Sequence, residues 1–233
     1  MQHMRLSGHA TGEKHAIFDS LAPCDVARLY AAAQTCDLAS GDTLIEEGED
    51  LDRVFIVETG ALKLRKSTRD GRQQIFAFAF AGDLIGRPFA CKFRHGAYAL
   101  GPSRLLAFPA AEFDRLTRQN PAFLASIARL AFADLDACRR LSVLLGRKHA
   151  DEKVASFFVE LARWQGQAAA LRSGRRLSLA LPMSRQDMAD FLGLTIETVS
   201  RQVSAMKDAG MIEFPGRCRV TILDPMAVLE TAG

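Results

Sequence analysis

The sequence predicts an α+β protein in which an antiparallel β-roll is followed by one long helix and then by a winged helix-turn-helix. Three observations lead to this fold class: short β-prone runs fill the first half of the chain, an uninterrupted helical pattern follows Asn120, and two short helices flank a tight turn in residues 185–201. The 233 residues suffice for one or two domains with cores of their own. An apolar share of 48% with 24% charged residues places the chain in the soluble globular class.

Residues 1–18 are polar and predict a mobile N-terminal arm, ahead of a β-roll over residues 19–119. Within the roll, β-prone runs such as TLIEE, RVFIVET and QQIFAFAF are separated by glycines at intervals of roughly 7 to 12 residues, as an antiparallel roll requires. Alternating aromatic residues usually belong to a core. We therefore expect five phenylalanines to fill the interior of the roll: Phe76, Phe78, Phe80, Phe89 and Phe93.

A long helix is predicted for residues 120–147, because Asn120 and Pro121 form an N-cap and first-turn pair and no glycine or further proline follows until Gly146. One seam runs along this helix in alternating steps of four and three, which suits a partner helix: Leu124, Ala128, Ala131, Leu135, Cys138, Ser142 and Leu145. A second stripe would pack on the roll of the same subunit: Phe123, Ile127, Leu130, Ala137, Leu141 and Leu144. Such a helix is either shared between the subunits of a homodimer or buried in a monomer.

Residues 148–233 contain the winged helix-turn-helix. Three residues supply the small packing residue, the tolerance for positive φ and the buried β-branched anchor that this motif needs: Ala189, Gly193 and Val199. The second helix would begin after Thr195 as its N-cap and end near Gly210. Four residues at helical spacing would face the core: Ile196, Val199, Val203 and Met206. The opposite face then carries Glu197, Ser200, Arg201 and Ser204.

That outward face has the chemistry of a major-groove reader. Arginine can donate two hydrogen bonds to guanine, and glutamate can accept one from cytosine N4. Arg201 and Glu197 are four residues apart, so they can address neighbouring bases or form an ordinary surface ion pair. The helix-turn-helix context favours double-stranded DNA as the partner. Phosphate contacts, which position the protein without specifying sequence, are expected from seven residues: Arg185, Ser184, Thr195, Thr198, Ser204, Arg217 and Arg219.

The segments LPMSRQDMADFLG and TIETVSRQVSAMKDAGMIEF resemble the DNA-binding end of the CRP/FNR family of bacterial regulators. Their E-x-x-S-R core is similar to that of the FNR/FixK branch, whose members read an inverted repeat of TTGAT type. The resemblance implies that Arg201 contacts the guanine, Glu197 the cytosine side, and Ser200 a neighbouring base or phosphate. It also implies a homodimer that activates transcription by recruiting RNA polymerase.

Within the roll, GDTLIEEGED and FIVETGALKL resemble the sensor domain of the same family, a jelly roll of the cyclic-nucleotide-binding kind. In the cyclic-nucleotide branch, a Gly-Glu pair followed by an Arg-Ser or Arg-Thr pair holds the ligand. This chain has Gly-Arg at residues 86–87 and His-Gly-Ala at residues 95–97, so the ribose-binding carboxylate is missing. We expect no cyclic nucleotide and no other cofactor, and gating by a cyclic nucleotide or by haem on His95 or Cys91 is the alternative.

The cysteines and histidines predict no metal site. Regulators of the FNR type hold an iron–sulfur cluster on closely spaced N-terminal cysteines, whereas the five cysteines here stand far apart and include no C-x-x-C pair. Cys218 lies between Arg217 and Arg219 in a predicted wing hairpin around Pro215-Gly216. Flanking cations are expected to lower the pKa of this thiol, so Cys218 is a candidate redox site.

The sequence carries no nucleophile elbow, phosphate loop or metal motif, so no catalytic residue is predicted and an enzyme is the disfavoured alternative. No apolar run reaches the length of a membrane-spanning helix, and the N-terminus lacks the apolar core of a signal peptide. We therefore expect a cytoplasmic regulator of transcription that makes no membrane contact and acts in oxygen- or redox-linked gene control.

Overall fold

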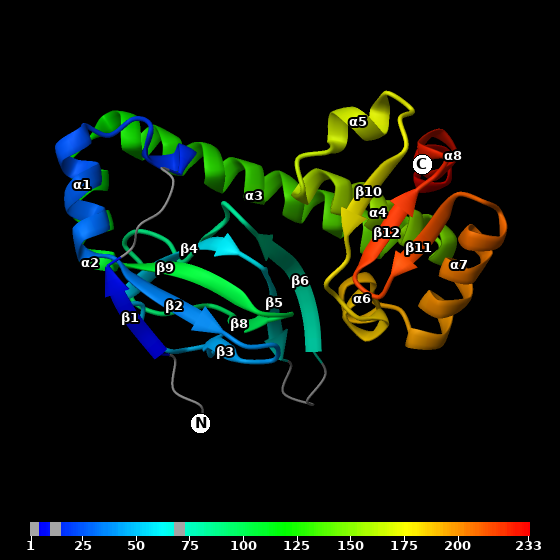
Figure 1. Ribbon diagram of the computed structural model, residues 1–233, viewed down its shortest axis with the longest axis horizontal. Coiled ribbons are helices and arrows are strands. Elements are labelled where there is room, and N and C mark those ends of the chain that lie inside the picture. The colour runs from blue at the N-terminus through cyan, green and yellow to red at the C-terminus, as the bar shows by residue number, and fades with distance from the viewer. Residues whose placement is uncertain (1–4, 10–14, 68–72) are drawn as a thin grey trace. The chain divides into compact units, whose positions relative to one another are not determined.

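The computed structural model describes residues 5–9, 15–67 and 73–233. Two compact units make up the chain, Met1–Lys66 with Ala77–Ala137 and Ser67–Phe76 with Cys138–Gly233. The first unit carries most of the β-roll and the second carries the helix-turn-helix (Figure 1). The division falls inside the long helix, which contributes residues to both units.

Two antiparallel sheets form the β-roll, with strand orders β1-β2-β9-β4-β7 and β3-β8-β5-β6. The strands are β1 (Arg5–His9), β2 (Gln34–Leu38), β3 (Thr43–Ile45), β4 (Arg53–Thr59), β5 (Ala61–Ser67), β6 (Gln73–Phe80), β7 (Leu84–Ile85), β8 (Gly96–Ala99) and β9 (Ser103–Pro109). The predicted runs are confirmed, because TLIEE contains β3, RVFIVET is β4 and QQIFAFAF is β6. The α+β class with an N-terminal roll is therefore correct.

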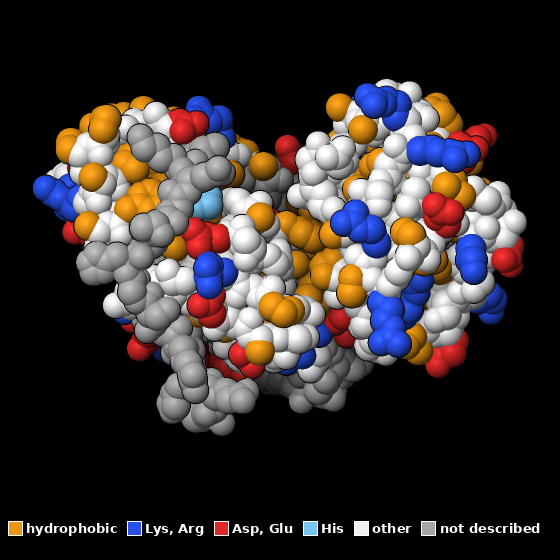
Figure 2. All heavy atoms as spheres, viewed as in Figure 1, with side chains coloured by type: hydrophobic (Ala, Val, Ile, Leu, Met, Phe, Trp, Pro, Cys, Tyr) orange, Lys and Arg blue, Asp and Glu red, His pale blue; other side chains and the backbone are white. Residues whose placement is uncertain are grey.

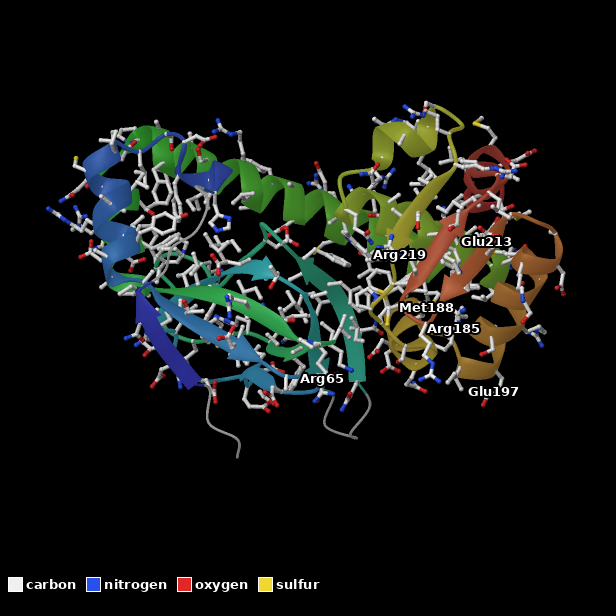
Figure 3. The ribbon with its side chains drawn as sticks, in the orientation of Figure 1. Arg65, Arg185, Met188, Glu197, Glu213 and Arg219 are labelled. Carbon is white, nitrogen blue, oxygen red and sulfur yellow. The ribbon has the colours of Figure 1, made fainter. Side chains whose placement is uncertain are left out.

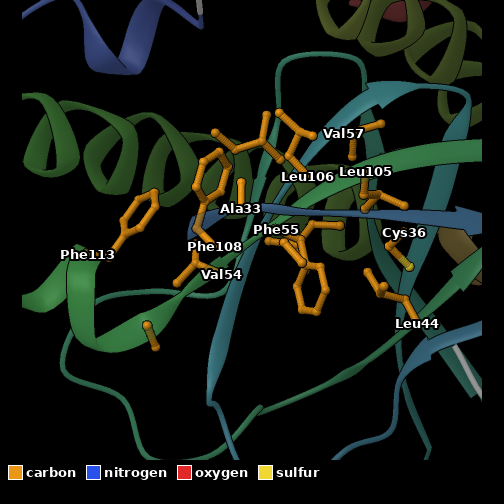
Figure 4. Packing of buried hydrophobic residues seen from close by; sticks show 14 of the residues in the cluster. Ala33, Cys36, Leu44, Val54, Phe55, Val57, Leu105, Leu106, Phe108 and Phe113 are labelled. Atoms are coloured by element: carbon orange, nitrogen blue, oxygen red, sulfur yellow. The ribbon is translucent and has the colours of Figure 1, made fainter. Parts of the chain in front are cut away.

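An aromatic cluster joins the roll to its short helices η1 (Ala16–Phe18), α1 (Pro23–Ala32) and α2 (Ala110–Gln119). The ring centroid of Phe18 lies 5.5 Å from that of Phe108 and 5.9 Å from that of Phe113, both edge to face. Phe123 joins the cluster with its centroid 5.8 Å from that of Phe113. Such aromatic pairs contribute about 0.5–1.5 kcal/mol each beyond the area they bury. Figure 4 shows Phe108 and Phe113 among the residues of this core.

Two described parts of residues 1–18, the segment predicted as a mobile arm, have secondary structure. Arg5–His9 forms β1, which pairs with β2, and Ala16–Phe18 forms η1. Phe18 is only 1% exposed, in the centre of the aromatic cluster. The polar sequence of residues 5–9 does not predict a strand, because an edge strand can be held by main-chain hydrogen bonds alone.

Only one of the five phenylalanines expected inside the roll belongs to its core cluster. Phe93 does, with its ring centroid 6.5 Å from that of Phe55. On β6, Ala79 lies in that cluster, and successive strand residues point to opposite faces. The three phenylalanines of β6 alternate with Ala79 and therefore lie on the other face, where two are buried and one is half-buried: Phe78, Phe80 and Phe76.

Phe89 departs further from the prediction, because 52% of it is exposed. Its backbone has a φ of 59°, the only positive value for a non-glycine residue among the described residues. The N–H of Phe89 donates to Asp114 Oδ1 at 2.8 Å, and the guanidinium of Arg118 lies 5.0 Å from the centroid of its ring. Both partners belong to α2, so contacts with this helix hold the ring on the surface of the roll.

The long helix α3 (Pro121–Arg147) begins where the sequence predicts and continues for 27 residues. Asn120 caps it, since Asn120 Oδ1 accepts a hydrogen bond from the N–H of Phe123 at 3.0 Å. Most of the predicted seam is exposed or half-exposed: Leu124, Ala128, Ala131, Leu135, Cys138 and Ser142. Phe132 and Val143, which the prediction omits, widen this apolar surface because they are 65% and 55% exposed.

Two residues of α3 lie elsewhere than predicted. Leu130, assigned to the stripe on the roll, is 41% exposed, whereas Phe123 and Leu144 of that stripe are buried. Leu145, the last seam residue, is half-buried near the helix-turn-helix, because a Cβ atom placed on Gly193 would lie 3.5 Å from Leu145 Cδ2. A straight helix turns by about 20° per heptad relative to a repeat of 3.5, so a seam drawn with that repeat leaves its face after three heptads.

The second unit contains a three-stranded sheet of order β10-β12-β11 and five helices after α3. These elements are α4 (Ala150–Trp164), α5 (Ala168–Arg172), β10 (Leu177–Ala180), α6 (Arg185–Leu192), α7 (Ile196–Asp208), β11 (Ile212–Gly216), β12 (Arg219–Ile222) and α8 (Pro225–Ala232). Trp164 packs edge to face on Phe157 of α4 and on Phe191 of α6, with centroids 5.9 Å and 5.5 Å away. In the described parts of the chain, no helix is both long and apolar enough to cross a membrane.

Candidate nucleic-acid interface

Helices α6 and α7 form the predicted helix-turn-helix. Gly193 ends α6 in the left-handed region, with φ of 61° and ψ of 40°, which is the conformation predicted for it. Ala189 of α6 and Val199 of α7 are both fully buried, as predicted. Ser184 caps α6 and Asp187 completes the capping box: Ser184 Oγ accepts a hydrogen bond from the N–H of Asp187 at 3.1 Å, and Asp187 Oδ2 accepts one from the N–H of Ser184 at 2.9 Å.

Helix α7 presents one apolar face and one polar face, as its periodicity predicts. Val199, Val203 and Met206 are at most 6% exposed. Ile196, which was expected beside them, is 38% exposed because it is the first residue of α7 and extends past the packed part of the helix. The four residues of the predicted outward face are all exposed: Glu197, Ser200, Arg201 and Ser204. Figure 3 shows Glu197 at the outer end of α7.

A hydroxyl network orders the first turn of α7. Thr195 Oγ1 accepts a hydrogen bond from the N–H of Thr198 at 3.2 Å and lies 3.1 Å from Thr198 Oγ1. Hydrogen bonds from the backbone N–H of Glu197 and from the Thr195 hydroxyl lower the pKa of the Glu197 carboxyl. The carboxylate of Glu197 thus accepts hydrogen bonds from the first turn of α7. Thr195 and Thr198, which were expected to contact phosphates, also form hydrogen bonds with each other within the protein.

The wing hairpin turns two residues later than predicted. Gly216 pairs with Arg219, so Arg217 and Cys218 form the turn, whereas the sequence suggested Pro215-Gly216. Between the pairs Glu213–Thr221 and Gly216–Arg219, two residues of β11 face one residue of β12, which is a β-bulge. Proline has no N–H to donate to the ladder, so Pro215 favours a bulge here instead of a turn.

Cys218 and both flanking cations are exposed at this hairpin. The carbonyl oxygen of Cys218 accepts a hydrogen bond from the N–H of Leu181 at 2.8 Å, and Arg219 Nη1 donates to Ser178 Oγ at 3.3 Å. The hairpin is thereby joined to β10 and the segment that follows it. Figure 2 shows several separate Lys and Arg groups on the surface of the second unit, which contains this sheet and α7.

Arg185 is placed differently from the other expected phosphate contacts, because it is half-buried. Its guanidinium lies 4.6 Å from the centroid of the Phe214 ring in β11, and Nη1 lies 3.2 Å from Met188 Sδ. Burial lowers the pKa of Arg185 from its ordinary value. Phe214 was not among the predicted site residues, because a single aromatic residue in a hairpin carries no signal. The Ser-x-x-Asp pattern of the capping box, in contrast, can be recognised in the sequence.

Within the described ranges, no three His, Cys, Asp or Glu side chains lie close enough together to hold a metal ion. Gly86 ends the short strand β7 with a φ of 100°, and Arg87 after it is exposed. Four cysteines are exposed and Cys36 is buried.

Comparison with known proteins gives the class and then the family. Residues 152–230 match the Crp-like helix-turn-helix domain, and residues 35–120 match the cyclic nucleotide-binding domain. Together with the ordered, exposed face of α7, these matches define a DNA-binding regulator of transcription, and they confirm the predicted roll and reader.

Relatives over almost the whole chain include the transcriptional activator protein FnrL of Cereibacter sphaeroides, which is 34% identical over 215 residues, covering 92% of this chain and 85% of FnrL. The nitrogen fixation regulation protein FixK of Bradyrhizobium diazoefficiens is 36% identical over 213 residues, covering 91% and 88%. The solved structure of FixK2 from Bradyrhizobium japonicum superposes with a TM-score of 0.77 at 28% identity, covering 86% of this chain and 98% of FixK2. The chain therefore belongs to the CRP/FNR family of transcription regulators and is not an enzyme.

Replacement of Thr195 by valine tests the hydroxyl network, because it removes the hydroxyl and keeps the volume. The free energy of unfolding should fall by about 1 kcal/mol with the loss of the N-cap. The pKa of Glu197 should rise towards its ordinary value of 4.5. Since the folded-state pKa is lowered, the stabilising interaction is present above pH 4.5 and is lost as the pH falls through the lowered value.

Denaturant unfolding and a carboxyl NMR titration measure the two quantities. Thr195→Ser is the matched control, because it keeps the hydroxyl and should leave both nearly unchanged. An unaltered Glu197 titration in Thr195→Val would show that the hydroxyl does not orient this carboxylate.

Proposed function

We propose that the protein is a transcription activator that binds, as a homodimer, an inverted repeat of TTGAT type in bacterial DNA. The observation that carries this proposal is the exposed face of α7, on which Glu197, Ser200 and Arg201 lie together with no apolar neighbour between them. FnrL, the relative with 34% identity, is named a transcriptional activator. We propose the same activity for the present chain and expect it to act in the cytoplasm.

In this proposal three residues of α7 read base edges. Arg201 donates two hydrogen bonds to guanine O6 and N7, and Glu197 accepts one from the cytosine amino group. Ser200 lies between them on the same face and contacts a neighbouring base or phosphate. Phosphates on either side are held by the hydroxyls and cations around the reader: Ser184, Thr195, Thr198, Ser204, Arg217 and Arg219.

The exposed apolar surface of α3 supplies the dimer contact. Large apolar side chains of α3 are exposed, among them Leu124 at 47%, Leu135 at 44% and Phe132 at 65%. Exposure of this apolar surface to water costs free energy, and burial against a second copy of the helix would remove that cost. A two-fold axis along this surface presents two identical α7 helices to two half-sites about one turn of DNA apart. RNA polymerase is the proposed further partner, because activation requires that the bound dimer recruit it.

Control by oxidation is the proposed signal, without a small-molecule effector. Arg87 is a cation at the place where a cyclic nucleotide needs an acceptor for its ribose hydroxyl, which argues against that ligand. Cys218 is exposed at the tip of the wing between two arginines. Its oxidation by a peroxide to a sulfenic acid, with release of water, would add bulk beside DNA phosphates, and further oxidation would add negative charge.

Arg201→Ala tests the base contact. Binding to a duplex with two TTGAT half-sites should weaken by about 1 to 3 kcal/mol per contact, and the preference at one base pair of each half-site should relax. Anisotropy titrations against single-base variants, all at one salt concentration, give both quantities. Arg217→Ala is the control, because loss of a phosphate contact should weaken every sequence alike. Uniform weakening by Arg201→Ala would contradict its assignment as a base reader.

Leu135→Glu tests the dimer surface, because it puts two like charges near the proposed axis. Sedimentation equilibrium should show a monomer, and affinity for the inverted repeat should fall far more than affinity for a single half-site. Met226→Glu in α8 is the matched control, since Met226 is also an exposed apolar residue, at 57%. A dimer that survives Leu135→Glu would place the interface elsewhere.

Cys218→Ala tests oxidative control. Peroxide should weaken DNA binding by the wild-type protein and leave the variant unaffected. Cys24→Ala is the control because Cys24 is also exposed but lies in α1, outside the wing and the dimer surface, and it should remain sensitive. Burial, with smaller contributions from nearby charges, raises the pKa of Cys36 to about 11, so this thiol stays protonated and inert in the assay. Equal sensitivity of wild type and Cys218→Ala would exclude Cys218 as the sensor.

A further inference from the structure

We propose that Arg185 acts in DNA binding as a positioning residue: it holds the wing against α6 by stacking on Phe214, and the wing in turn delivers Arg217 and Arg219 to the DNA backbone. This inference rests on the proposed function and extends it to a residue, Phe214, that carries no charge and can contact no phosphate through an ion pair. It also changes the role expected for Arg185, from a free cation at the protein surface to a link between two elements of the reader.

The geometry around Arg185 is that of a fixed side chain. The guanidinium carbon lies 4.6 Å from the centroid of the Phe214 ring, inside the range in which a cation is attracted to a ring face. Nη1 lies 3.2 Å from Met188 Sδ, one helical turn further along α6, and Figure 3 shows the two side chains next to each other. This guanidinium is half-buried and packs against both a ring and a thioether, so its position is set by contacts inside the protein.

The ring of Phe214 belongs to the part of β11 in which the hydrogen-bonded pairing with β12 is interrupted. The β-bulge at Phe214 and Pro215 interrupts the pairing between β11 and β12, and Pro215 has no N–H to donate. In the sheet order β10-β12-β11, β11 is the edge strand. At the bulge, therefore, the strand has a partner on neither side, and a contact from outside the sheet is needed to fix its direction.

The two sides of the wing are thus held by different interactions. On the β12 side, the carbonyl of Cys218 is bonded to the N–H of Leu181, and Arg219 to the hydroxyl of Ser178. On the β11 side, Arg185 on Phe214 joins the wing to the first turn of α6. That turn is itself rigid, because the capping box of Ser184 and Asp187 closes it and Asp187 is only 7% exposed.

Arginine suits this role and lysine does not. A guanidinium is planar and stacks on a ring, whereas an ammonium is compact and strongly hydrated. Arg185→Lys therefore keeps the charge that a phosphate contact needs and loses most of the stacking that the wing needs. Phe214→Leu makes the complementary change, because it keeps an apolar side chain and removes the ring. Phe214→Tyr keeps the ring and is the matched control.

The experiment measures DNA affinity of the full chain against KCl concentration, with the TTGAT duplex and a random duplex as probes. The slope of log K against log salt reports the number of phosphate contacts, at about 0.9 per contact. If Arg185 positions the wing, Arg185→Lys and Phe214→Leu should each reduce affinity on the order of 5-fold. Each should also lower the slope, by at most about 1.8 per protomer, which is the value for complete displacement of both Arg217 and Arg219. Phe214→Tyr should match the wild type, and the Arg185→Lys, Phe214→Leu double variant should lose little more than either single one.

The opposite results overturn the inference. If Arg185 contacts a phosphate itself, Phe214→Leu should leave the slope unchanged, Arg185→Lys should keep it, and only Arg185→Ala should lower it, by about 0.9 per protomer. Thermal unfolding followed by circular dichroism verifies that each variant is folded, and recovery in Phe214→Tyr separates loss of the ring from loss of the fold. Failure of the wild-type protein to bind either duplex would refute the proposed function itself, whereas salt-dependent binding with equal slopes in all variants would refute only the role of Arg185.

Discussion

The backbone of Gly193 turns in the left-handed region, and the direction of α7 relative to α6 follows from that turn. A residue with a Cβ atom would pay about 1–2 kcal/mol to adopt this conformation. Once the turn is set, Ala189 and Val199 are both fully buried, and burial of Val199 fixes the rotation of α7 about its own axis. That rotation decides which residues face outward, so the composition of the reading face depends on contacts made on the opposite side of the helix.

Within the reader, the two proposed properties, sequence recognition by α7 and backbone attachment by the wing, depend on separate structural supports. The first turn of α7 is ordered by the Thr195 hydroxyl, which accepts a hydrogen bond from the N–H of Thr198 and donates one to the carboxylate of Glu197. The wing depends on tertiary contacts with β10, Leu181 and α6 instead. A substitution can therefore alter one property and spare the other, which allows a regulator to change affinity for DNA without changing the sequence that it prefers.

Elements with strong local signals were predictable from the sequence, and elements that exist through tertiary contacts were not. β4 and α3 were readable because a β-branched run and a capped helical repeat determine them locally. β2 (QTCDL) has no such pattern and forms by pairing with β9 along its whole length. Phe89 is drawn to the surface by Asp114, 25 residues further along the chain. For the same reason the exposed positions of Glu197 and Arg201 on α7 were predictable, whereas the contact between Phe214 and Arg185 is encoded by no local pattern.

The position of Trp164 gives the protein an intrinsic optical reporter. It is the single tryptophan of the sequence, and its ring touches Phe157 in α4 and Phe191 in α6. Indole emission depends on the polarity and rigidity of the surroundings, so any rearrangement that shifts α6 against α4 changes the fluorescence of the unlabelled chain. Arrival of a signal at the reading helices is therefore observable in real time, before DNA is added and without knowledge of which signal it is.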